Sequence, residues 1–171
     1  MLRRLPYGTN AAVDSKEKIM ADFVSIISAV ENIAATKTDR TTILKRVCEL
    51  LHKEVSYFDW VGFYLIDPEN PKTLLLGPFV GAPTEHLKIN VGEGICGQAA
   101  QEKNTFVVQD VSKETNYLSC SSQVKSEIVV PIYANGEIVG ELDIDSHELS
   151  PFTPEDRTNL ERICELLSAL F

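Results

Sequence analysis

Basic residues are scarce in this chain, and long apolar runs are absent from it. Its 171 residues include 16 Lys and Arg against 25 Asp and Glu, which gives a formal net charge of -9. A polyanion would be repelled by this surplus of acid, so nucleic acid is not an expected partner. No run of apolar residues approaches the roughly 18 that a membrane-spanning helix needs, so a membrane is not expected either.

Cysteine is also sparse, and its four copies lie far apart, at Cys48, Cys96, Cys120 and Cys164. The chain contains no Cys-x-x-Cys motif and no paired histidine spacing, so no metal site is expected. The N-terminus has two arginines but no apolar segment after them of the kind that a signal peptide carries. We therefore expect a cytoplasmic protein whose cysteines are reduced thiols.

The apolar residues that are present suffice for one packed domain. They make up 44% of the chain, and the length fits a single domain comfortably. Pro6, Gly8 and Asn10 interrupt any periodic pattern near the start. We expect residues 1–14 to be irregular and residues 15–171 to form the domain.

Apolar periodicity predicts helices at both ends of that domain. Steps of three and four favour a helix from Ser15 to about Ile33 and a second one that begins at the N-cap Asp39. Thr153 and Pro154, followed by two acidic residues, are typical of the start of a last helix that runs to the C-terminus.

Between these helices the pattern changes to that of strands. Dense β-formers and turn residues predict strands over 60–66, 72–79, 105–109, 127–133 and 137–145. Asn135-Gly136 is a strong signal for a hairpin turn. A glycine-rich stretch at 92–97 is expected to lead into a short helix, 81–90 to be a connection, and 110–124 to be a long polar loop. The order predicts an α+β fold in which helices cover one face of an antiparallel sheet.

The last predicted strand carries a row of acidic residues. Leu142 and Ile144 point to one face of it, so Glu141, Asp143 and Asp145 point to the other. A solvated sheet edge is the simplest interpretation. A cluster of carboxylates also suits the binding of an ammonium group or general acid catalysis, because crowding keeps a carboxyl protonated. Glu127, on the preceding strand, could join this cluster across the pairing.

Two cysteines stand outside the apolar stripes of the helices. Cys96 lies near the start of the predicted short helix, where the helix N-terminus would favour its thiolate. Cys120 lies among serines in the long polar loop, which indicates an accessible thiol. Cys48 and Cys164 adjoin apolar helix faces and are expected in the core. Trp60, the only tryptophan, is either a core residue or the wall of a small pocket.

Three segments of the chain resemble one family, the free methionine-(R)-sulfoxide reductases, which are stand-alone GAF domains. They are Trp60-Val-Gly-Phe-Tyr-Leu, Gly92-Glu-Gly-Ile-Cys96-Gly, and Ser126-Glu127-Ile-Val-Val-Pro131 together with Leu142-Asp143-Ile-Asp145-Ser146. The resemblance covers roughly residues 17–170. It implies a GAF-like six-stranded antiparallel sheet with the N- and C-terminal helices packed on one face, and a homodimer.

The resemblance also implies roles for particular residues. Cys120 matches the family's nucleophile and Cys96 the cysteine of its glycine-rich segment, while Trp60, Glu127, Asp143 and Asp145 match residues of its substrate pocket. Glu127 or an aspartate would donate the proton. The implied reaction needs no bound cofactor, and a thioredoxin system driven by NADPH would reduce the resulting disulfide. A third cysteine that many members carry is replaced here by His86, so either Cys96 acts as the resolving thiol or the activity is altered or lost.

Two other functions fit parts of the pattern. A non-catalytic GAF domain that binds a small ligand as a sensor would not need the third cysteine. Metal binding by the Asp143-x-Asp145 strand is the weaker alternative, because alternate carboxylates alone, with no histidine or cysteine added, make a poor ligand set.

Overall fold

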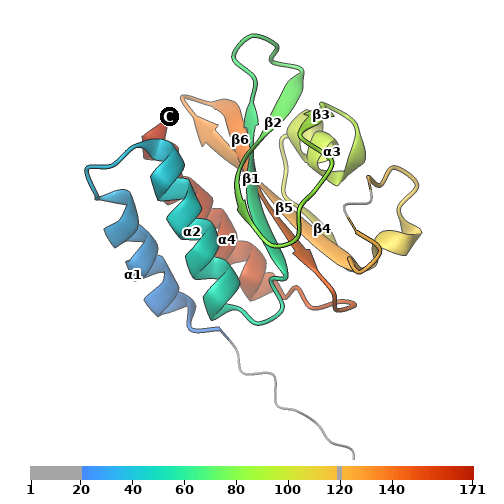
Figure 1. Ribbon diagram of the computed structural model, residues 1–171, viewed down its shortest axis with the longest axis horizontal. Helices are drawn as coiled ribbons and strands as arrows, with labels where there is room; N and C mark the ends of the chain where they lie inside the picture. Colours follow the sequence, from blue (N-terminus) through green and yellow to red (C-terminus); the bar gives the residue numbers. More distant parts are fainter. Residues whose placement is uncertain (1–20, 119–120) are drawn as a thin grey trace, which may run out of the picture.

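The structure is a computed structural model that describes residues 21–118 and 121–171. Its centre is a six-stranded sheet with the strand order β3-β2-β1-β6-β5-β4 (Figure 1). Every neighbouring pair in this sheet is antiparallel. The strands are β1 (Trp60–Ile66), β2 (Thr73–Val80), β3 (Lys88–Asn90), β4 (Phe106–Val108), β5 (Ser126–Ala134) and β6 (Glu137–Ser146).

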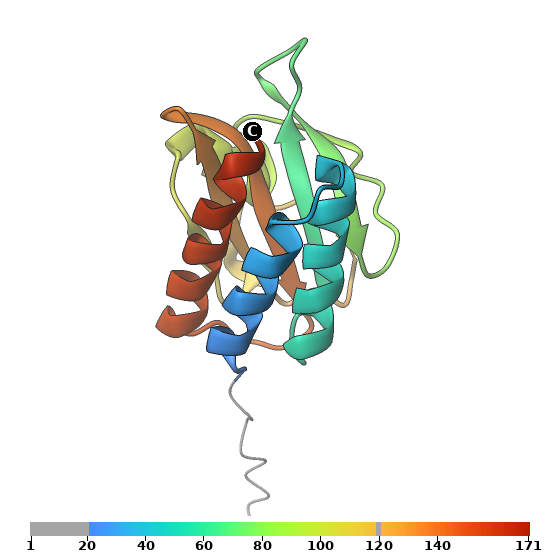
Figure 2. The ribbon, with the colours of Figure 1, turned by 90° about the vertical axis from the view of Figure 1, so that its left-hand side faces the viewer.

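Three long helices lie together on one face of the sheet, as Figures 1 and 2 show from two directions. They are α1 (Phe23–Ala34), α2 (Arg40–Glu54) and α4 (Pro154–Leu167). The fourth helix, α3 (Gly94–Glu102), contacts β5 and β6 from the opposite face. Two short 3-10 turns complete the regular elements, η1 (Val111–Lys113) and η2 (Ser168–Leu170). None of the helices in the described part of the chain combines the length and apolar character needed to span a bilayer.

Local sequence explains where α2 and α4 begin. The Asp39 side chain accepts a hydrogen bond from the backbone N–H of Thr42, which caps α2. Thr153 and Asp156 form a reciprocal capping box at the start of α4, with Pro154 in the first turn. Both starts agree with the sequence prediction. The first helix was predicted from Ser15, which lies outside the described residues, but α1 begins at Phe23, because Asp22 caps it by accepting a hydrogen bond from the backbone N–H of Ser25.

The sheet separates two apolar clusters. The larger one fills the space between the sheet and α1, α2 and α4, and contains both Cys48 and Cys164. The smaller one lies between the sheet and α3, and contains Trp60, Tyr64 and Cys96. The prediction that Cys48 and Cys164 are core residues is therefore confirmed, since they are 0% and 2% exposed.

The α+β fold with helices over one face is confirmed, and the strand predictions hold to within about two residues. The Asn135-Gly136 turn joins β5 to β6 with positive φ at both residues, 53° and 81°, as a tight hairpin of this type requires. One strand was missed: β3 occupies part of the segment predicted as a plain connection. Its three residues are too few to carry a visible alternation, and it exists because β2 offers an edge for pairing.

Candidate active site

The register of the sheet gathers the acidic residues on the face covered by α3. Residues directly opposite each other on antiparallel strands project to the same face. Asp145 of β6 lies opposite Trp60 of β1 and Glu127 of β5, while Asp143 lies opposite Gly62. The central position of β6, between β1 and β5, thus brings the carboxylates of two strands and the Trp60 ring to a single surface.

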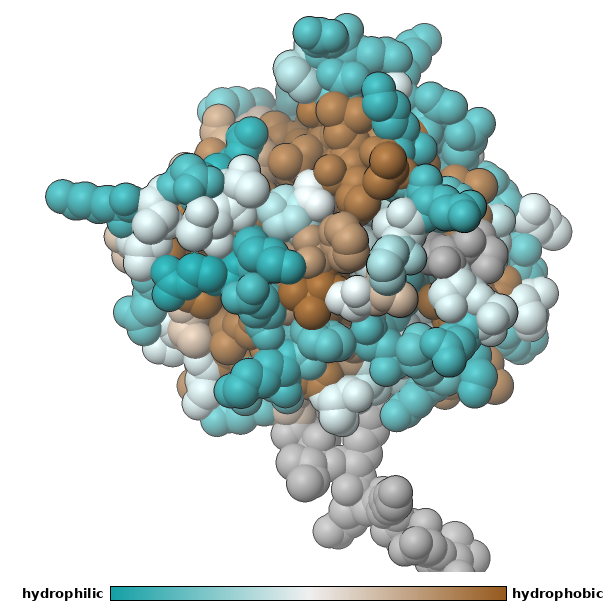
Figure 3. Space-filling model, in the orientation of Figure 1, coloured by the Kyte–Doolittle hydropathy of each residue, from teal (hydrophilic) through white to brown (hydrophobic). Residues whose placement is uncertain are grey.

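This surface lies beneath other parts of the chain, so the interpretation as a solvated sheet edge is wrong. The exposed fractions are 5% for Glu127, 0% for Glu141, 2% for Asp143 and 1% for Asp145. In the described residues no Lys or Arg forms an ion pair with any of the four. The space-filling view in Figure 3 shows apolar residues gathered over part of the molecular surface and ringed by hydrophilic ones.

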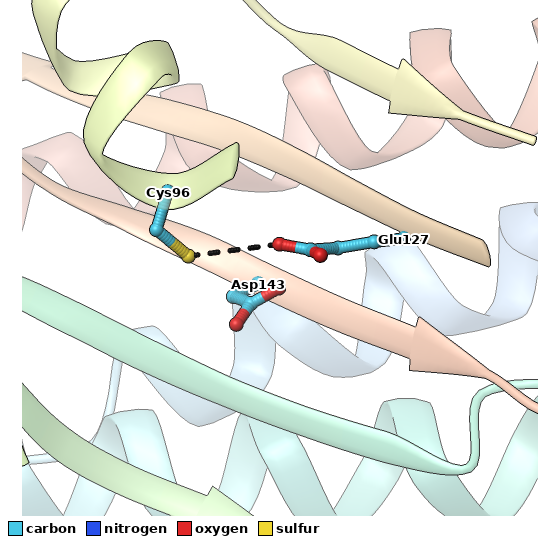
Figure 4. Close-up of side chains that lie close together, drawn as sticks. All are labelled: Cys96, Glu127 and Asp143. Carbon is cyan, nitrogen blue, oxygen red and sulfur yellow. Dashed lines mark hydrogen bonds between the residues drawn. The ribbon is translucent and has the colours of Figure 1, made fainter. Parts of the chain in front are cut away.

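Cys96 of α3 lies directly over the carboxylates. Its Sγ donates a hydrogen bond to Glu127 Oε1 at 3.8 Å, and Figure 4 shows the thiol projecting from α3 toward β5 and β6. Ligand atoms of Cys96, Glu127 and Asp143 all lie within 4.8 Å of one another. Residues from a helix and two strands thus converge on one point.

Burial raises the pKa of every carboxyl in this cluster, and repulsion by neighbouring charges adds to it for all but Asp143. Burial raises the pKa of Asp143 to about 7, against the weaker effect of the Cys96 thiol. Burial, and then the charges of Asp143 and its neighbours, raise the pKa values of Glu127 and Asp145 well above the ordinary range. Burial followed by the Asp143 charge does the same to the pKa of Glu141. A proton is therefore available from Asp143 near neutral pH.

The thiol of Cys96 differs from the expectation based on its place near a helix start. Burial is the largest cause, and the charges of Asp143, Glu141 and Glu127 add to it, so the pKa of Cys96 lies well above its usual value. The helix terminus favours the thiolate, but desolvation and the carboxylates outweigh it. The surroundings of Cys96 thus favour its protonated thiol over the thiolate.

Two small cavities flank the row of carboxylates. One, of about 10 Å³, is lined by Cys96, Glu127, Asp143, His86 and Leu118, with three further residues. The other, of about 50 Å³, is lined by residues that include Trp60, Asp145, His147 and Ser121. The predicted nucleophile Cys120 lies outside the described residues. Its near neighbours in the chain, Leu118 and Ser121, each line one of the two cavities.

Trp60 lies at the larger cavity with its ring fixed on several sides. Its Nε1 donates to the Ala82 carbonyl at 3.0 Å, and the ring stacks on Phe79 at a centroid distance of 5.4 Å. Gly62 leaves the space that the indole occupies, because a Cβ there would come within 2.2 Å of the ring. The ring is therefore a preformed apolar wall beside Asp145.

A family model described as "GAF domain" matches residues 37–171. The chain belongs to the GAF domain family. This GAF domain is 39% identical over 153 residues to "GAF domain-containing protein A" of Dictyostelium discoideum, a match that covers 90% of this chain and 92% of the relative. It is 34% identical over 131 residues to the free methionine-R-sulfoxide reductase of Escherichia coli, which covers 77% of each chain.

A solved structure agrees with these relatives. The X-ray structure of free methionine-R-sulfoxide reductase from Neisseria meningitidis in complex with its substrate matches with a TM-score of 0.82 and 35% identity, over 87% of each chain. The resemblance of this GAF domain to the free methionine-R-sulfoxide reductases, inferred from three sequence segments, is confirmed.

Several residues at the site of this GAF domain were not singled out from the sequence. Tyr64 follows Trp60 in β1 and lies on the same face of the sheet. Its hydroxyl donates a hydrogen bond to the His86 carbonyl oxygen at 2.8 Å. The period of two along β1 could have revealed it. Asn116 ties the loop to the start of α3, accepting from Gly94 N at 3.0 Å and donating to Gly92 O at 2.8 Å. No local sequence pattern predicts these contacts of Asn116.

Proposed function

We propose that this GAF domain is an oxidoreductase that reduces free L-methionine-(R)-sulfoxide to methionine by thiol chemistry. The observation that carries the proposal is the buried cluster of Cys96, Glu127 and Asp143, whose ligand atoms lie within 4.8 Å of one another. The similarity to free methionine-R-sulfoxide reductases over most of the chain supports this reaction over a sensor role.

The substrate's charged and apolar groups each have a counterpart among these residues. Its ammonium group would lie on the carboxylates of Glu127, Asp143 and Asp145, which lack a basic partner in residues 21–118 and 121–171. Its methyl and thioether would pack on the Trp60 ring. Its carboxylate would accept hydrogen bonds from backbone N–H groups of the 116–121 loop, as expected from the shortage of cations there.

Cys120 acts as the nucleophile in this proposal. Its thiolate attacks the sulfoxide sulfur, one of the buried carboxyls protonates the oxygen, and the products are methionine and a cysteine sulfenic acid. A second thiol, assigned to Cys96, attacks the sulfenic sulfur, which releases water and leaves a disulfide. A thioredoxin-type dithiol, itself reduced with NADPH, then restores both thiols. No prosthetic group takes part in these steps.

The cellular compartment that we propose for this protein follows from the redox requirements of the reaction. A thiol cycle of this kind needs a reducing compartment, so we assign the protein to the cytoplasm. The homodimer and the thioredoxin-type reductant implied by the family resemblance are proposed on that basis.

The direct test of this function is a turnover assay. With thioredoxin, thioredoxin reductase and NADPH, the purified protein should consume NADPH and form methionine when given free methionine-(R)-sulfoxide. The (S)-epimer and a peptide that contains methionine sulfoxide serve as matched controls, and neither should be reduced at a comparable rate. Absence of methionine formation from the (R)-epimer would refute the proposal.

A second prediction concerns the disulfide itself. One equivalent of substrate without reductant should link Cys96 to Cys120, because His86 occupies the place of the usual third cysteine. Mass mapping of the alkylated, digested protein gives the pairing. A link from Cys120 to Cys48 or Cys164, or no link at all, would contradict the role assigned to Cys96.

A further inference from the structure

We propose that Cys96, Glu127 and Asp143 form a binding site for a divalent cation of the zinc class, which blocks the thiol chemistry when it is occupied. The cation binding rests on the geometry of these residues alone. Its effect on turnover rests on the proposed function.

The spacing of the three side chains is close to that of a zinc centre. Zn–S bonds of about 2.3 Å and Zn–O bonds of about 2.0–2.2 Å in a tetrahedral site put sulfur and oxygen about 3.6 Å apart. The distance from Cys96 Sγ to Glu127 Oε1 is 3.8 Å, and all three ligand atoms lie within 4.8 Å of one another. Adjustments of side-chain torsions would therefore suffice to coordinate an ion.

An oxygen atom without a partner points to the same ligand. Oδ1 of Asp143, which lines the cavity beside Cys96, is buried without a hydrogen-bond partner among the described residues. The oxygens of Glu141 and Asp145, on the same strand, are likewise without partners there. Such groups are costly to bury unless a proton or a cation compensates them. A divalent cation at the cluster would neutralise several of these carboxylates at once.

The available space and the ligand types narrow the choice of occupant. The cavity beside Cys96 has a volume of about 10 Å³, which is about one water-sized sphere, so an ion fits better than a molecule without rearrangement. A cysteine ligand selects Zn²⁺ and similar metals over Mg²⁺ and Ca²⁺, which prefer all-oxygen sites. The sequence offered only carboxylates at alternate positions of one strand. The tertiary structure adds a thiol from α3 and a carboxylate from β5.

An occupied site is incompatible with the proposed reduction. The metal would hold the Cys96 sulfur away from disulfide formation and would neutralise the carboxylates that bind the substrate's ammonium group. Zinc should therefore inhibit turnover, and a chelator should restore it.

Cobalt absorption of the reduced full-length protein under nitrogen tests the binding without relying on turnover. One Co²⁺ per chain should give a thiolate-to-metal charge-transfer band and the visible bands of a tetrahedral ion, and added Zn²⁺ should remove both. Cys96→Ala should abolish the charge-transfer band. Glu127→Gln and Asp143→Asn should weaken binding by about tenfold or more. The matched thiol controls, Cys48→Ala and Cys164→Ala, remove buried thiols from the other face of the sheet and should keep the wild-type spectrum.

Thermal melts confirm that each variant folds before its spectrum is interpreted. The proposal is overturned if the wild type binds no stoichiometric Co²⁺, if the band survives in Cys96→Ala, or if Cys48→Ala or Cys164→Ala abolishes it in a folded protein. It is also overturned if both carboxylate variants fold and bind like the wild type. Failure of the turnover assay with binding intact would refute the proposed function and leave the metal site standing.

Discussion

Replacement of Cys120 by serine should lower the turnover of free methionine-(R)-sulfoxide by about 10³-fold or more. A serine hydroxyl remains protonated at neutral pH and is a far weaker nucleophile toward sulfur than a thiolate. The measurement is methionine formed per chain in a single turnover, which needs no external reductant. In the wild type it should approach one.

Cys48→Ala is the matched control for this variant. Cys48 is fully buried on the helix side of the sheet, in the apolar cluster that does not contain Cys96. Burial raises the pKa of its thiol to about 12, so it has no thiolate near neutral pH. The control should keep its turnover. If Cys120→Ser retained single turnover, the nucleophile would have to be another cysteine.

Asp143→Asn should impair activity and stabilise the fold at the same time. Loss of one charge from the ammonium site should lower kcat/KM by about 100-fold, which corresponds to the roughly 3 kcal/mol of a strong charged hydrogen bond. The same change removes a buried ionisable group, so the free energy of unfolding above pH 7 should rise. Steady-state kinetics and urea unfolding measure the two effects on one preparation.

The predicted gain in the free energy of unfolding follows from how Asp143 makes stability depend on pH. The folded-state pKa of Asp143 is raised from 3.8 to about 7, so the folded protein binds more protons than the unfolded chain in that interval. The contribution of Asp143 to the free energy of unfolding should therefore be greatest at or below about pH 4 and fall as pH rises from there to about 7, by up to about 1.4 kcal/mol per pH unit for each such group. Asp39, whose pKa a hydrogen bond from Thr42 lowers, acts in the opposite sense below pH 4.

Asp143→Asn should flatten this dependence relative to the wild type. Leu149, which is 60% exposed, offers a control position, since Leu149→Ala should leave the slope unchanged. A variant with the wild-type slope, or a wild type that grows more stable between pH 5 and 8, would contradict the assignment of a raised pKa to Asp143.

Most of the fold was predictable because its signals are local. The alternation along β6, the Asn135-Gly136 turn, and the caps at Asp39 and Thr153 each act within a few residues of chain. The edge strand β3 was not predictable, because its three residues become a strand only through pairing with β2.

The candidate site was likewise predictable only in part. Sequence spacing placed Glu141, Asp143 and Asp145 on one face of a strand, but it left open whether that face was solvated. The register between β5, β6 and β1 brought Glu127 and Trp60 to the same face, and α3 covered it. Burial then reversed the expectation for Cys96, since desolvation outweighs the helix terminus.

The sequence by itself determined most of the elements, the family resemblance and the identity of the acidic residues, because period, turn chemistry and residue type are properties of short stretches. Only the tertiary structure decided that the acidic face is buried, that a thiol from a distant helix lies 3.8 Å from one of its carboxylates, and that burial raises the pKa of Asp143 to about 7. The reason is physical: desolvation and charge repulsion depend on what packs against a side chain, and those neighbours come from segments far apart in the chain.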